Sequence, residues 1–109
     1  MRAAIMAAAV TVIVCVIGLT ADVRPKPKTH TVTIEGMRFQ PESLTVTAGD
    51  IVVWVNKDLV PHTATSKGRG FDSQVIQTEK SWKLTARKKG DFAYVCTLHP
   101  TMTAMLRVR

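Results

Sequence analysis

Positions 91–102 read DFAYVCTLHPTM, and this stretch decides the fold because it joins a strand pattern to a close set of soft side chains. In an extended strand, successive side chains point to opposite faces of the sheet. Phe92, Tyr94 and Cys96 therefore share one face, and we expect it to be the interior because two of the three are aromatic. The Cys96 thiol should point into the protein.

The rest of the chain predicts a small all-β domain. Short runs of β-branched and aromatic residues alternate with turn signals such as Ala48-Gly49-Asp50. No stretch after residue 22 has the 3.6-residue period of an amphipathic helix. We expect strands over 29–35, 43–47, 51–56, 62–65, 81–86, 91–96 and 103–109. Short strands at this density are typical of a β-sandwich or barrel.

The N-terminus has the pattern of an export signal. Residues 3–19 are almost wholly apolar and follow Arg2, as in a secretory signal peptide. We expect cleavage after Ala21, although Leu19 is unusual at the third position before the cut. An uncleaved membrane anchor is the alternative, because such a run lies at the lower end of the spanning length. The predicted divisions are a signal peptide or anchor over 1–21, a Pro- and Lys-rich linker over 22–28, and one domain over 29–109.

Charge and cysteine content narrow the function. The 109 residues carry a formal net charge of +7, and loss of residues 1–21 removes Arg2 and leaves +6. The same loss removes Cys15, so Cys96 becomes a lone thiol in an exported, periplasmic domain. Such a thiol must be buried or occupied, for example by a metal. We expect no nucleic-acid partner, because export separates the protein from nucleic acid and no aromatic residues interleave with the basic ones.

The candidate metal ligands are two imidazoles, a thiolate and a thioether. Cys96, His99 and Met102 are spaced C-x2-H-x2-M, and His62 lies 34 positions before the cysteine. This is the ligand set of a blue-copper electron-transfer centre. Strand parity favours Met102 over Met105 as the thioether, because Met102 falls on the inward side of the last strand. Met37 is expected to fill the core.

Other site classes fit these residues less well. Structural zinc wants four strong ligands, usually with more cysteine, and a c-type haem needs a second cysteine. In a cysteine protease a histidine base is required, and His99 follows Cys96 too closely for that role. A copper-storage or copper-delivery protein would use the same ligands and stays open. A multicopper enzyme would need H-x-H pairs, which the sequence lacks, and a non-redox adhesion module is the remaining alternative.

The pattern N-x-D-x-x-P-H over 56–62, together with GDFAYVCTLHPTM over 90–102, resembles the cupredoxins, in particular the amicyanin, plastocyanin and pseudoazurin group. The resemblance covers residues 30–109 and implies a Greek-key β-sandwich of about seven to eight strands. It also implies one copper ion, with His62, Cys96 and His99 as equatorial ligands and Met102 as a long axial ligand. Thr63 is a departure, since amicyanin-like proteins have Asn there; its backbone N–H can still reach the Cys96 sulfur, but the side-chain tether should differ.

The expected function is that of a monomeric one-electron carrier and not an enzyme, because copper would occupy the only nucleophile. Redox partners should dock briefly near His99, with membrane contact only if residues 1–21 are retained. The apolar residues expected around that docking point are Val60, Pro61, Leu98 and Pro100. We expect an acidic partner, steered by the basic residues nearest the copper end, which are Lys57, Lys67 and Arg69.

Overall fold

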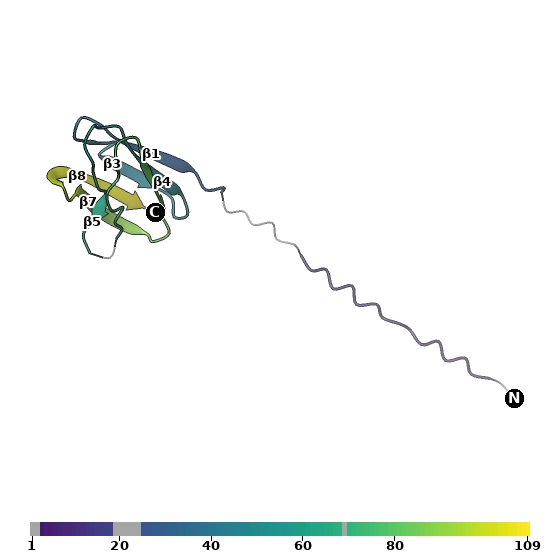
Figure 1. Ribbon diagram of the computed structural model, residues 1–109. Helices are drawn as coiled ribbons and strands as arrows, with labels where there is room; N and C mark the ends of the chain where they lie inside the picture. The colour runs from purple at the N-terminus through teal and green to yellow at the C-terminus, as the bar shows by residue number, and fades with distance from the viewer. Residues whose placement is uncertain (1–2, 19–24, 69) are drawn as a thin grey trace.

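Two four-stranded sheets form the domain, and the predicted all-β sandwich is confirmed (Figure 1). The computed structural model describes residues 3–18, 25–68 and 70–109. One sheet has the order β2-β1-β4-β6 and the other the order β3-β8-β7-β5. The strands are β1 (Thr29–Ile34), β2 (Phe39–Gln40), β3 (Ser43–Val46), β4 (Ile51–Asn56), β5 (Thr65–Ser66), β6 (Ser81–Thr85), β7 (Gly90–Cys96) and β8 (His99–Val108).

The N-terminal apolar segment is separate from this sandwich. Residues 3–18 form no strand or helix, are exposed, and extend away from the domain (Figure 1). Across the described ranges, the chain forms no helix with the length and apolar character needed to span a bilayer. The expected cleavage site and residues 22–24 of the expected linker lie outside the described residues. The division into signal, linker and domain stays a prediction.

Three strand predictions differ from the structure. The short strand β2 is absent from the predicted strands, because two residues after a tight turn give no strand pattern. A strand over 62–65 is wrong: only Thr65–Ser66 pairs with β7, while His62 makes an isolated bridge to Ile76. The backbone around His62 is engaged by the Ile76 loop, through hydrogen bonds of 3.2 and 2.7 Å, and is therefore kept out of the sheet. Strand β8 begins at His99 and not at residue 103.

The buried face of β7 packs against the opposite sheet, as its alternation predicts. Tyr94 and Cys96 are buried and Phe92 is partly buried. Trp54 of β4 donates its indole N–H to the Tyr94 hydroxyl at 3.3 Å, so the two sheets are joined by a polar contact inside the core. Burial raises the pKa of Tyr94 to about 12, against a smaller opposing effect of the hydrogen bond from Trp54. This contact fixes β7 two residues before the cysteine.

The hairpin of β7 and β8 changes register where the candidate ligands lie. The strands pair regularly from Gly90 with Val108 to Val95 with Thr103, and then Cys96 pairs with His99. Residues 100–102 are therefore extra on β8, and they follow His99 as a bulge. Met102 is 4% exposed on this bulge and lies on the buried side, as its parity predicts.

The core around β8 should carry much of the stability of the domain. Leu106 lies on β8 between β3 and β7 and is 1% exposed, whereas Leu59 is 93% exposed. Leu106→Ala should lower the free energy of unfolding by about 2–5 kcal/mol, because it leaves a cavity in a packed core. Leu59→Ala deletes the same atoms and should change it by less than about 0.5 kcal/mol. Urea denaturation of the metal-free protein measures both, and similar losses would contradict this core.

Candidate metal centre

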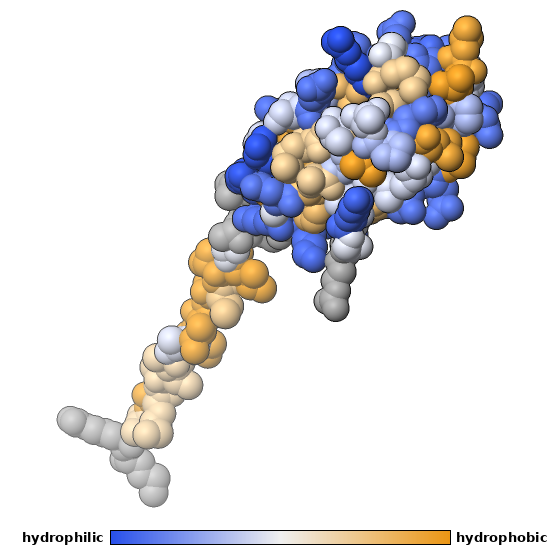
Figure 2. Space-filling model, turned by 90° about the vertical axis from the view of Figure 1, so that its left-hand side faces the viewer, coloured by the Kyte–Doolittle hydropathy of each residue, from blue (hydrophilic) through white to orange (hydrophobic). Residues whose placement is uncertain are grey.

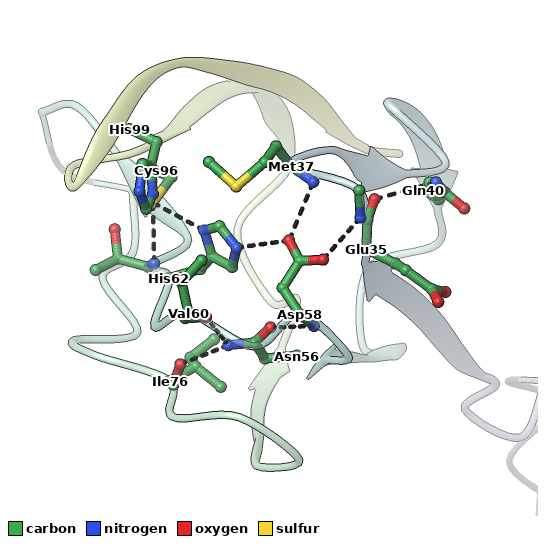
Figure 3. A network of polar contacts seen from close by, with 12 residues as sticks. Glu35, Met37, Gln40, Asn56, Asp58, Val60, His62, Ile76, Cys96 and His99 are labelled. Atoms are coloured by element: carbon green, nitrogen blue, oxygen red, sulfur yellow. Dashed lines mark hydrogen bonds and ion pairs between the residues drawn. The ribbon is translucent and has the colours of Figure 1, made fainter.

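Three of the four predicted ligands meet at one end of the sandwich. The donor atoms of His62, Cys96 and His99 all lie within 4.8 Å of one another. Each histidine presents Nδ1 to the Cys96 Sγ at 3.6 Å, and the two ring centroids are 4.9 Å apart (Figure 3). Ligand atoms bound at about 2.0–2.3 Å to one ion lie roughly 3.5 Å apart, so these separations suit a single metal ion.

The Cys96 sulfur is fully buried and receives one backbone hydrogen bond. The Thr63 N–H donates to Sγ at 3.3 Å, as the sequence allowed. Cys96 forms no disulfide. A buried cysteine sulfur with one amide donor and two imidazoles beside it is suited to a soft metal such as copper.

Thr63 ties the two ligand loops together through its side chain. Its hydroxyl oxygen accepts a hydrogen bond from the Thr97 N–H at 2.9 Å and lies 3.0 Å from the Thr97 hydroxyl. The Thr65 hydroxyl lies 3.0 Å from the same oxygen. The loop that carries His62 is thereby fixed to the turn that joins Cys96 and His99. Thr63 thus supplies the side-chain tether at this position.

Side-chain hydrogen bonds also hold the His62 loop in place. Asn56, at the end of β4, is fully buried. Its amide N–H groups donate to the Val60 and Ile76 carbonyls, both at 2.9 Å. Its side-chain oxygen accepts a hydrogen bond from the Asp58 N–H at 2.9 Å. Asp58 in turn accepts from the His62 ring at 2.8 Å (Figure 3). Sequence reasoning assigned no role to Asn56 or Asp58, although both belong to the N-x-D-x-x-P-H pattern.

Asp58 is a charged group within this network. Partial burial alone would raise its pKa, but hydrogen bonds from the Met37 N–H, the His62 ring and the Gly36 N–H together hold the pKa below its ordinary value. The carboxylate is therefore ionised at neutral pH. A fixed negative charge thus lies beside one of the candidate ligands.

Of Met37, Met102 and Met105, only Met37 departs from the prediction. Met102 is buried on the bulge that follows His99, whereas Met105 is only partly buried. Met37 is 43% exposed, so its expected role as core filler is wrong. It lies in the turn between β1 and β2, and its thioether points toward His62 and Cys96 in Figure 3. Its positive φ of 58° belongs to this turn and not to a strand that faces the core.

The ligand loops expose several apolar side chains. Leu59, Val60 and Leu98 are exposed at 93%, 40% and 47%. Figure 2 shows apolar side chains gathered at the end of the domain farthest from residues 3–18. His99 is only partly buried here, whereas His62 is inaccessible.

Of the basic residues predicted to steer a partner, at least one already pairs with an acidic residue. Lys57 Nζ forms an ion pair with Glu79 at 3.1 Å. Lys67 is exposed, and Arg69 lies outside the described residues. Part of the positive charge expected at this end is therefore neutralised locally.

Comparison with known proteins shows the family of this chain. Residues 4–108 match the family model described as a cupredoxin-like domain. Amicyanin of Paracoccus versutus is 33% identical over 76 residues, a match that covers 65% of this chain and 58% of that protein. Amicyanin-alpha of Methylorubrum extorquens (strain AM1) is 30% identical, with coverage of 65% and 64%. The match thus spans about three fifths of the length of these curated relatives.

Solved structures agree with this fold. A mutant amicyanin in its Cu(I) form superposes with a TM-score of 0.71 at 26% identity, covering 74% of this chain and 82% of that one. A copper-containing nitrite reductase from Thermus scotoductus gives 0.69 at 27% identity, covering 80% of this chain but 23% of that chain. From the family match, and in agreement with the sandwich and its cluster of His, Cys and His, this chain belongs to the family of cupredoxin-like domains.

Proposed function

We propose that this protein is a type 1 copper protein that carries single electrons between redox partners. The observation that supports it best is the meeting of the His62, Cys96 and His99 donor atoms within 4.8 Å. Met102, buried on the bulge of β8, is the fourth proposed ligand. Copper bound to thiolate and imidazole can cycle between Cu(I) and Cu(II), because soft sulfur suits the first state and imidazole suits both.

The protein's part in this function is to hold the ligands in one arrangement. The Thr63 tether fixes the two loops to each other, and the Asn56 network fixes the His62 loop to β4. Ligands held in this way need little rearrangement when the charge at the site changes. Fast outer-sphere electron transfer depends on such small rearrangement.

The partly exposed ring of His99 is the proposed route for the electron. His62 and Cys96 are fully buried, so His99 is the proposed ligand through which a partner has the most direct access. The apolar rim formed by Val60 and Leu98 would be covered on docking. Weak redox encounters typically bury less than about 1,200 Å² in total, which a patch of this kind can supply.

We further propose export to the periplasm, with residues 1–21 as a removed signal peptide and residues 29–109 as a monomeric carrier domain. The apolar run after Arg2 supports this. The likeness to nitrite reductase covers only 23% of that chain, so it supports a shared domain and not a shared reaction.

The oxidised copper protein should be blue, through charge transfer from the Cys96 thiolate to Cu(II). Cys96→Ser should remove the intense visible band, because a hydroxyl is a poor soft ligand. Absorption spectra of the copper-loaded proteins measure this. A wild-type copper complex without that band would reject a type 1 site. A blue protein with slow electron self-exchange would instead indicate copper storage or delivery.

Met102 should be the axial ligand. Met102→Gln replaces a soft thioether with a harder amide oxygen, which favours Cu(II), so the reduction potential should fall. Met105→Gln is the matched control, because Met105 faces the other side of β8, and it should leave the potential nearly unchanged. Voltammetry measures the reduction potential of both variants. A larger shift for Met105→Gln than for Met102→Gln would reject Met102 as the ligand.

Charge reversals at Lys57, Lys67 and Arg69 should slow reduction by an acidic partner more than reversals at 87–89. The latter lie before β7, whose length places them roughly 20 Å from the copper end, beyond the Debye length of about 8 Å. Lys57 should have the smallest effect of the three, because Glu79 already partners it. Stopped-flow rates at low and high salt test this, and equal effects from both groups would count against it.

A further inference from the structure

The carboxylate of Asp58 lies against the buried histidine of the proposed copper site. Asp58 Oδ2 is 2.8 Å from His62 Nε2, and the His62 side chain is fully buried while that of Asp58 is 13% exposed. A carboxylate can only accept hydrogen bonds, so the Nε2 atom must carry the proton. The lone pair of the neutral ring then resides on Nδ1, the atom that faces the Cys96 sulfur at 3.6 Å.

The same carboxylate is anchored by the turn between β1 and β2. The Gly36 N–H donates to Asp58 Oδ1 at 2.7 Å, and the Met37 N–H donates to Oδ2 at 3.0 Å. Both turn residues have positive φ, 63° and 58°. This conformation is uncommon for a residue with a side chain such as Met37. It directs two consecutive amides at one anion, an arrangement typical of anion-binding turns.

Asp58 is also held from its backbone. Its N–H donates to the oxygen of Asn56, which is itself fixed by two carbonyls of the surrounding loops. The carboxylate therefore cannot turn away from His62 without loss of several hydrogen bonds (Figure 3). Within the described part of the chain, the His99 ring has no comparable carboxylate contact. The two histidines thus differ in the charge beside them.

We infer that Asp58 is a positioning residue that holds His62 with Nδ1 toward the metal and lowers the reduction potential of the centre. This inference rests on the proposed copper function. A negative charge one imidazole ring away from the metal stabilises Cu(II) more than Cu(I). A hydrogen bond from Nε2 to a carboxylate also makes the ring a stronger donor, which acts in the same direction.

The test is Asp58→Asn in the full chain. Asparagine keeps the size of the side chain and an acceptor oxygen for His62, but it has no charge. The ratio of Cu(II) to Cu(I) affinity should fall about tenfold, which raises the potential of a one-electron couple by about 59 mV. The variant should stay blue, because all four proposed ligands remain. Asp58→Glu, which keeps the charge, should recover much of the shift.

Asp72→Asn is the matched control. The Asp72 carboxylate accepts from the Thr65 hydroxyl at 3.1 Å and from the Gln74 N–H at 2.8 Å, so it is hydrogen-bonded like Asp58 but touches no proposed ligand. Its neutralisation should leave the potential nearly unchanged. Blue Asp58→Asn protein with an unchanged potential, or an equal shift from Asp72→Asn, would overturn the inference while leaving the copper function intact. Absence of the blue band from the wild type would instead reject the copper function.

A measurement on the wild type does not depend on whether the variants fold. In the NMR spectrum of the Cu(I) protein, the Nε2 proton of His62 should be visible and should exchange slowly with solvent. The Nε2 proton of His99 should exchange much faster. A His62 ring without a proton on Nε2, or with rapid exchange there, would overturn the role of Asp58.

Discussion

The structure of the site depends on the burial of one thiol, that of Cys96, at the end of the strand pair β7 and β8. The thiol is inaccessible to solvent, receives the Thr63 N–H at 3.3 Å, and has an imidazole nitrogen 3.6 Å away on each of two loops. Burial excludes water from a nucleophilic sulfur, and the two imidazoles complete its surroundings. The change of register that pairs Cys96 with His99 is what brings a ligand of β8 back to this point.

The loops and the sheets stabilise each other around this thiol. Tyr94, two residues earlier on β7, is fixed in the core by the indole of Trp54, so the direction of the Cys96 side chain is set from within the sandwich. At the open end, Thr63 joins the loop of His62 to the turn before His99. Hydrogen bonds of the folded chain therefore help to set the geometry of the ligands.

The sequence could predict what is local or periodic. The alternation of β7 placed Cys96 inward, and parity along β8 placed Met102 on the buried side; both hold in the structure. It could not predict that residues 62–64 leave the sheet, because that depends on hydrogen bonds to Ile76 and Ser73 in another loop. Nor could it find the contact of Asp58 with the turn at Gly36, since the two are 22 positions apart and no spacing rule links them. Met37 was placed wrongly because it lies near Phe39 in the sequence, while its backbone conformation belongs to a turn.

The two histidines have different roles in the proposed centre. His62 is enclosed by the domain, with one ring nitrogen committed to Asp58 and the other to the site, so it serves to fix geometry and charge. His99 is partly exposed among apolar side chains and is the ring that a partner can approach. Charge placed beside His99 would have to be desolvated at every encounter, whereas charge beside His62 is already enclosed by amides of the protein. A negative group that acts on the metal without hindering docking therefore belongs on the His62 side, which is where Asp58 lies.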